Sequence, residues 1–124
     1  MNSSIGKASD AASRLAQPIA LKEAKALVAE LKGWELVAGK TLRQDFKMKD
    51  FMAAVHFINA VARAAEAEDH HPDLHLTGYR NLVIELTTHS IGGLSMNDFI
   101  LAEKIDGIHR DMKQPERRRH AAAV

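Results

Sequence analysis

The segment Phe51-Met-Ala-Ala-Val-His-Phe-Ile-Asn-Ala-Val-Ala-Arg-Ala-Ala-Glu-Ala67 has the clearest secondary-structure signal in the chain. Its apolar residues recur at the spacing of an α-helix and form one predicted stripe of Phe51, Ala54, Val55, Ile58, Val61, Ala62 and Ala65. Asp50 stands where a side chain can cap the helix N-terminus. His56 and Arg63 fall off the stripe, so we expect them in solvent. The pattern predicts a helix over 51–67 with one buried face.

Two pairs of predicted strands flank this helix. Residues 34–37 and 41–48 suit a hairpin around the turn at 38–40, with Leu42, Phe46 and Met48 on one parity. After the helix, residues 73–79 and 82–88 are predicted as a second pair. Its inner face is formed by Leu82, Ile84 and Leu86. We assign Trp34, at the start of the first strand, to the core.

A further helix is predicted near each end of the chain. Residues 20–31 carry an apolar stripe, bounded by Pro18 and Gly33, of Leu21, Ala24, Leu27, Val28 and Leu31. The last helix runs to about Met112, and Ser95-Met-Asn-Asp98 at its start resembles a capping box. The order helix, two strands, helix, two strands, helix predicts an α+β fold. We expect a four-stranded antiparallel sheet with the helices packed on one face.

The length of 124 residues fits a single domain. We place that domain at 19–112, between a polar leader over 1–18 that we expect to be flexible and a polar tail over 113–124. The core of so short a domain is modest, so self-association is a natural way to bury more surface.

Composition excludes several classes of function. Seventeen Lys and Arg against sixteen Asp and Glu give a net charge of +1, which argues against a broad nucleic-acid or membrane surface. The absence of cysteine excludes disulfides and thiolate metal sites. No apolar run approaches the ~18 residues of a membrane span, and the first residues lack an apolar signal core. We therefore expect a cytoplasmic protein with no nucleic-acid or membrane partner.

Histidines and carboxylates are concentrated just after the central helix, in Glu66-Ala-Glu-Asp-His70-His71-Pro72. Three of the seven histidines, His70, His71 and His75, fall within six residues. Imidazole exchanges protons near neutral pH, so such a cluster is typical of acid/base sites. Adjacent histidines before a proline are also common in polar turns, and the cluster alone does not separate the two. The carboxylates stand at the unfavourable end of a helix dipole, where neighbouring imidazoles are their natural partners.

Other chemistries fit the residues less well. Metal binding has suitable ligand types in Glu66 and four histidines, but the spacing matches no H-E-x-x-H motif and adjacent histidines rarely bind one ion. No serine lies in a G-x-S-x-G elbow, and the pair Gly92-Gly93 lacks a phosphate-binding context. Proton transfer without a covalent intermediate remains, and we predict neither a metal nor a cofactor.

The pattern Glu66-x3-His70-His71-Pro72-x6-Tyr79-x9-His89-x8-Asp98 resembles the active-site signature of the pterin-4a-carbinolamine dehydratases. The segment from Thr87 to Asp98 is also similar to that family's Thr-His…Gly-Leu-(Ser/Thr)…Asp run, and the likeness covers roughly 21–112. The resemblance implies the fold predicted above and a homodimer or homotetramer. It further implies loss of water from a 4a-hydroxytetrahydropterin, which recycles the pterin of aromatic amino-acid hydroxylases. Pterin would be the substrate rather than a cofactor.

The resemblance also implies roles for individual residues. His70, His71 and His89 would surround the pterin and share the acid/base work, and we expect His71 and His89 to be the proton-transfer pair. Glu66 would orient an imidazole. Asp98 would hold His89 or cap the last helix.

The remaining site residues would shape the pocket. Pro72 would fix the turn that separates the two adjacent histidines, and Tyr79, Leu74 and Thr88 would contact the substrate. Leu74 stands where many members carry an aromatic residue, and the strand over 74–79 is one residue longer than in the animal enzymes. His75 is additional to the signature.

Relatives of this kind also act as binding proteins. Some stabilise the dimer of a homeodomain transcription factor, and a dehydratase-like group assists assembly of the carbon-fixing carboxylase in carboxysomes. The alternative function is therefore a non-enzymatic assembly factor or coactivator with a protein partner. The complete signature favours the enzyme. Action on another pterin, as in molybdenum-cofactor metabolism, is a third possibility.

Overall fold

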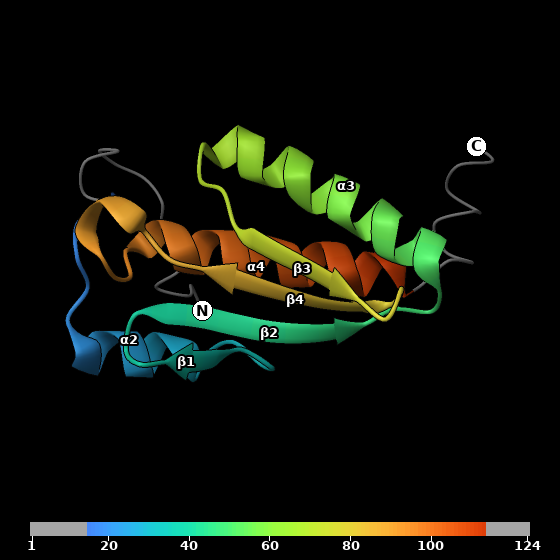
Figure 1. The fold of residues 1–124 in the computed structure, drawn as a ribbon. Helices are drawn as coiled ribbons and strands as arrows, with labels where there is room; N and C mark the ends of the chain where they lie inside the picture. Colours follow the sequence, from blue (N-terminus) through green and yellow to red (C-terminus); the bar gives the residue numbers. More distant parts are fainter. Residues whose placement is uncertain (1–14, 114–124) are drawn as a thin grey trace.

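The computed structural model describes residues 15–113, and its elements follow the predicted order (Figure 1). Most of the predicted leader (1–18) and tail (113–124) lies outside the described residues, so these boundaries stay predictions. The elements are α2 (Leu21–Val28), β1 (Glu35–Val37), β2 (Thr41–Lys47), α3 (Phe51–Glu68), β3 (Asp73–Thr77), β4 (Asn81–Leu86), the short 3₁₀ helix η1 (His89–Ile91) and α4 (Met96–Met112).

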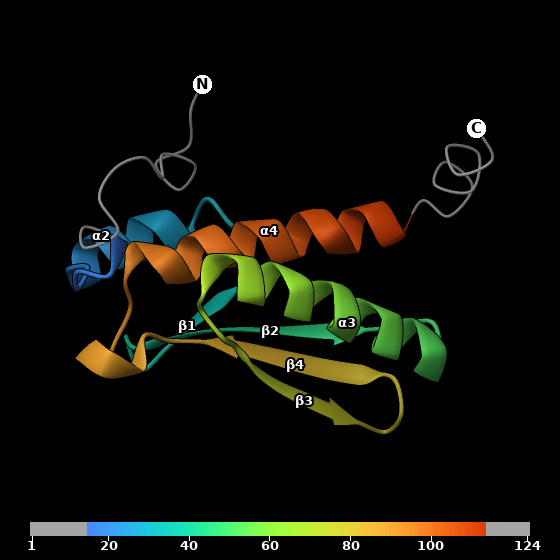
Figure 2. The ribbon, with the colours of Figure 1, turned by 90° about the horizontal axis from the view of Figure 1, so that it is seen from above.

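The four strands form one antiparallel sheet in the order β1-β2-β4-β3. The central pair sets the register, with Leu42 opposite Leu86 and Phe46 opposite Leu82. Figure 2 shows the helices together on one side of the sheet, which confirms the predicted α+β class and layer arrangement.

The core lies between the sheet and the helices. The alternation predicted for β2 and β4 is confirmed, because Leu42, Phe46, Met48, Leu82, Ile84 and Leu86 are all buried. Trp34 is also a core residue, as expected, and its ring meets that of Phe46 edge-on at a centroid distance of 6.1 Å. Phe46 in turn contacts Phe57 of α3 at 5.1 Å.

Helix α3 was predicted at nearly the right length but with its buried face rotated. Asp50 caps it as expected, accepting a hydrogen bond from the Ala53 N–H at 2.8 Å. Phe51 and Ala62, both assigned to the stripe, are exposed, whereas Phe57, left out of it, is fully buried. Apolar residues occur nearly all round this helix, so the sequence pattern does not single out the face that packs on Phe46. The residues that α3 buries are Ala54, Phe57, Val61 and Ala65.

Helix α2 is shorter than predicted. It ends at Val28 because the chain beyond Ala29 forms tighter bonds, from the Glu30 N–H to the Leu27 carbonyl and from the Leu31 N–H to the Val28 carbonyl. Leu31 is still buried, beyond the helix, while Leu21 at its start is half exposed.

Strand β3 is also shorter than predicted, and the turn that follows it begins earlier. Strand β3 ends at Thr77, and Tyr79 lies in the turn with a φ of 56° rather than in the strand. The next residue ties the turn to the segment before α3. The Arg80 Nε donates to the Met48 carbonyl at 2.8 Å, and the Met48 N–H donates to the Arg80 carbonyl at 2.8 Å.

Candidate functional site

The C-terminal end of α3 fixes the backbone of the two adjacent histidines. Asp69 adopts the left-handed conformation that commonly ends helices, with a φ of 52°, and aspartate tolerates that conformation better than most residues. The His70 N–H then returns to the Ala65 carbonyl at 3.0 Å. Pro72 is half-buried and leads directly into β3. The end of α3, the end of β4 and the start of α4 thus lie at the same end of the molecule (Figure 1).

His70 is paired with a buried carboxylate from the start of α4. Its Nε2 lies 2.6 Å from Asp98 Oδ1, and the two side chains are 11% and 0% exposed. The residues are 28 positions apart in the chain, so this contact joins α3 to α4. Buried charges of this kind persist only when they are paired and hydrogen-bonded. This pair is therefore built into the core rather than placed on the surface.

The second oxygen of Asp98 accepts two more hydrogen bonds. The Ser95 N–H donates to Oδ2 at 2.9 Å, which is the capping interaction that the sequence predicts, and the Thr88 hydroxyl donates to Oδ2 at 2.7 Å. Of the roles expected for Asp98, the helix cap is therefore present. The imidazole bonded to it is that of His70 and not that of His89. Thr88, two residues past the end of β4, is buried against Asp98, and His89 after it is exposed.

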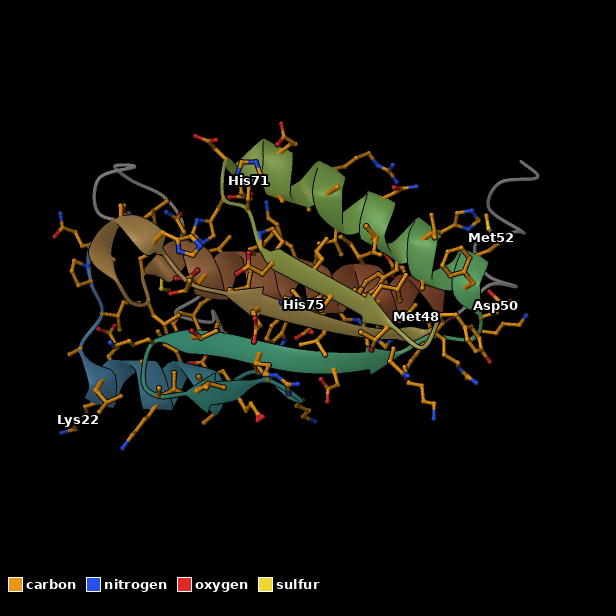
Figure 3. All side chains as sticks on the ribbon, viewed as in Figure 1. Lys22, Met48, Asp50, Met52, His71 and His75 are labelled. Carbon is orange, nitrogen blue, oxygen red and sulfur yellow. The ribbon has the colours of Figure 1, made fainter. Side chains whose placement is uncertain are left out.

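His71 has its own carboxylate, on the surface. Its Nε2 lies 2.6 Å from Glu66 Oε2, and these side chains are 58% and 76% exposed. Glu66 lies in the last turn of α3, and Figure 3 shows His71 at that end of the helix, with Asp50 and Met52 at the other. Glu68, two residues after Glu66, pairs with Lys104 of α4. The acidic end of α3 thus has cationic or imidazole partners, as the sequence suggested.

His89 lies near the Asp98 cluster because Thr88, the residue before it, is bonded to Asp98. It is exposed and is the first residue of η1. The loop that carries it is closed by a hydrogen bond from the Thr88 N–H to the Gly93 carbonyl at 2.8 Å. The Thr87 hydroxyl adds contacts to the carbonyls of Lys40, at 2.8 Å, and Gly93, at 3.2 Å. His89 is therefore held next to the Asp98 cluster by backbone, with its side chain in solvent.

The structure does not bring every expected site residue together. Tyr79 is 60% exposed at the far end of β3 from His71, and the five residues of β3 span roughly 16 Å of extended chain. Leu74 is half-buried and packs against the hydrophobic core. His75 lies on the open face of the sheet, where its Nε2 is 3.1 Å from Glu85 Oε1 (Figure 3).

Sequence reasoning missed one residue of this cluster. Ser95 was identified only as a helix start, but its hydroxyl is fully buried and lies 2.7 Å from the Thr88 hydroxyl. Thr88 was expected at the substrate, yet it is 7% exposed and bonded to Asp98. The available signal was the capping box itself, since an Asp in that motif already has one oxygen turned toward the helix start.

A second group of titratable residues lies further along α4. Burial raises the pKa of Asp106, partly opposed by hydrogen bonds to its Oδ1 from Trp34 Nε1 at 2.9 Å and Gln44 Nε2 at 3.2 Å. Burial also lowers the pKa of His109, helped by the charge of Lys113. The His109 ring is packed on Phe46, with centroids 4.9 Å apart. These residues pack in the middle of the fold, two helical turns and more from Asp98.

Two surface hollows lie away from the histidine pair. One, of about 690 Å³, separates α3 from α4 and is lined by residues that include His56, Arg63 and Met112. The other, of about 570 Å³, lies beside Asp106 and His109. Across residues 15–113, no group of three or more His, Asp or Glu side chains is arranged to hold a metal ion.

A family model for pterin 4 alpha carbinolamine dehydratase matches residues 17–108, which is most of the chain. The chain belongs to this dehydratase family. A Nitrosospira multiformis protein, provisionally named a pterin-4-alpha-carbinolamine dehydratase, is 47% identical over 89 residues, covering 72% of this chain and 77% of that protein. Pterin-4-alpha-carbinolamine dehydratase 2 of Arabidopsis thaliana, a mitochondrial protein, is 44% identical over 88 residues. That match covers 68% of this chain but only 47% of the longer plant protein.

Solved structures of the dehydratase family share the fold. A transcriptional coactivator/pterin dehydratase from Brucella melitensis superimposes with a TM-score of 0.70 at 32% identity, over 74% of this chain and 98% of that one. A pterin dehydratase-like protein, described as a RuBisCO assembly factor of the alpha-carboxysome, gives a TM-score of 0.51 at 19% identity and supports the fold alone. None of the helices within residues 15–113 has the length and apolar character needed to cross a membrane.

Proposed function

We propose that the protein removes water from a 4a-hydroxytetrahydropterin, giving the quinonoid dihydropterin, and so recycles a tetrahydropterin. In this reaction the C4a–O bond breaks, a ring N–H proton is lost, and a C=N double bond forms. One group must protonate the departing hydroxyl while another accepts the ring proton. The chemistry therefore needs two protein groups that contact the substrate and transfer protons, and histidine suits both tasks near neutral pH.

The observation that carries the proposal is the pair of adjacent histidines, each with its own carboxylate at 2.6 Å. A carboxylate partner fixes the tautomer of an imidazole and stabilises its protonated form, which is what a group that cycles between acid and base requires. His70, His71 and His89 are the proposed catalytic residues, with His71 and His89, both exposed, as the proton-transfer pair. Glu66 and Asp98 support them, and Pro72 holds the turn.

The test is dehydration of chemically generated 4a-hydroxytetrahydropterin by the purified protein. His71→Ala and His89→Ala are each expected to lower kcat by roughly 10²–10⁴-fold, the usual contribution of a general acid or base. The matched control is His75→Ala, because His75 is also an exposed histidine paired with a glutamate. Its rate is expected to stay that of the wild type. Wild-type rates in both site variants would disprove the assignment.

A second candidate role is protein binding. The Brucella melitensis relative is named both as a transcriptional coactivator and as a pterin dehydratase. Capture experiments with wild type and with His71→Ala distinguish the roles, because a partner bound equally by both does not depend on the catalytic histidine. If the wild-type protein shows no dehydration activity and captures a defined partner, the binding role is favoured.

We also propose that the protein forms a homodimer or homotetramer. Several large apolar side chains stay exposed on the single chain, among them Leu21, Phe51 and Met52, each at least half exposed. Light scattering after size-exclusion chromatography measures the state directly. The cytoplasmic location expected from the sequence likewise stays a prediction, since named plant relatives include mitochondrial and chloroplastic proteins.

A further inference from the structure

The hydroxyl groups behind His70 form a chain with a defined direction. The Thr88 hydroxyl has one proton, and it donates that proton to Asp98 Oδ2 at 2.7 Å. In its 2.7 Å contact with Ser95 Oγ, the Thr88 oxygen must therefore accept, so the Ser95 hydroxyl donates. The chain runs from Ser95 through Thr88 to the carboxylate, and such chains strengthen each bond within them.

The carboxylate at the end of this chain receives donors on both oxygens. Oδ2 accepts from the Thr88 hydroxyl and the Ser95 N–H, and Oδ1 faces His70 Nε2 at 2.6 Å. An ionised carboxylate can only accept, so Nε2 of His70 must carry the proton in that bond. Nδ1 is then the nitrogen of His70 that is left to accept or release a proton.

We infer that Thr88 and Ser95 are positioning residues that hold Asp98, and through it fix His70 with Nδ1 as its substrate-facing nitrogen. The inference rests on the proposed dehydration, and it reassigns Thr88 from substrate contact to the support of a catalytic side chain. Thr88 is 7% exposed and Ser95 is fully buried, so neither hydroxyl is placed to touch a substrate in solvent.

Helix capping alone does not account for this arrangement. A cap needs one carboxylate oxygen on the Ser95 N–H, and Asp98 supplies it at 2.9 Å. The Thr88 hydroxyl takes no part in the bond from the Ser95 N–H, yet it makes a shorter bond to the same oxygen. With Oδ2 held from two directions, the carboxylate cannot rotate, and Oδ1 keeps a constant direction toward His70. Fixing a tautomer in this way is the task of the buried aspartate in Ser-His-Asp hydrolases.

Thr88→Val tests the inference, because it keeps the β-branched shape and removes the hydroxyl. We expect kcat for dehydration to fall roughly tenfold, the cost of one hydrogen bond to a charged group, with KM unchanged. Thr88→Ser is expected to restore most of the rate. The matched control is Thr77→Val, because Thr77 is exposed at the end of β3 that lies farthest from the paired histidines. Equal losses in Thr77→Val and Thr88→Val, or no rescue by serine, would overturn the inference.

Nitrogen-15 NMR of the histidine side chains tests the same inference without any activity. Wild-type His70 is expected as the Nε2–H tautomer at pH 8, and its Nε2 proton signal is expected to move in Thr88→Val but not in Thr77→Val. An Nδ1–H tautomer in the wild type would contradict the inference, whatever the enzyme does. If Thr88→Val fails to fold, Ser95→Ala replaces it with the same expected change. An inactive wild type with the Nε2–H tautomer would reject the dehydration and leave the hydrogen-bond assignment standing.

Discussion

The two histidine–carboxylate pairs of the site have the same N···O distance of 2.6 Å but opposite surroundings. The His70–Asp98 pair is nearly closed to solvent, and the second oxygen of its carboxylate accepts two further hydrogen bonds. In the His71–Glu66 pair, more than half of each side chain is exposed. A distance alone therefore does not say what a pair does. One imidazole is fixed by the core, and its neighbour is free to reorient in solvent.

The largest expected difference between the pairs is in stability. Asp98→Ala is expected to lower the free energy of unfolding by about 3–5 kcal/mol, because it leaves a buried imidazole, a hydroxyl and an N–H without their acceptor. Glu66→Ala is expected to change it by less than about 1 kcal/mol, since exposed pairs contribute little. Urea denaturation followed by circular dichroism measures both. Equal losses in the two variants would show that burial does not separate the pairs.

A smaller difference is expected in chemical reactivity. Diethyl pyrocarbonate modifies accessible imidazoles, so His71 should react several times faster than His70, whose side chain is 11% exposed. Tandem mass spectrometry resolves the two adjacent positions. His75, which is 54% exposed in its own glutamate pair, is the internal reference and should react like His71. A His70 rate equal to that of His75 would mean that the buried pair opens readily.

The smallest effect is expected at Asp106, a half-buried carboxylate on the same helix as Asp98. Burial raises its pKa, so the folded state binds more protons than the unfolded state, and its contribution becomes destabilising as pH rises above the usual 3.8. Asp106→Asn keeps an acceptor for Trp34 and should therefore be more stable than the wild type at pH 7, with the gain disappearing near pH 3. Denaturation midpoints at both values give the measurement. A gain that grows toward acid pH would contradict the assigned direction.

Local patterns predicted the parts of this fold that depend on neighbouring residues. The alternation of Leu42, Phe46 and Met48, the Asp50 cap and the capping box at Ser95 each involve residues a few positions apart. They could therefore be recognised without knowing the tertiary arrangement.

The misses have the opposite character. The partner of Asp98 was misassigned because His70 is 28 residues away and meets it only when α3 and α4 pack. The buried face of α3 depends on contact with Phe46 in β2, and the helix itself is apolar on several sides. Tyr79 looked like a strand residue, but a left-handed turn ends β3 two positions earlier. In each case a long-range contact or a turn conformation decided the outcome, and neither produces a periodic pattern of apolar residues in the sequence.

The hydrogen bonds that join Arg80 to Met48 have an entropic consequence for the turn that carries the two adjacent histidines. They clamp the tip of the β3–β4 hairpin to the segment before α3, so α3 and β3 are anchored to each other at the ends farthest from the histidines. Because α3 and β3 are regular elements, this clamp also limits the movement of the link over 69–72 that joins their other ends. Little chain remains to be ordered there, so a ligand of the proposed kind would lose little of its contact energy to ordering the turn.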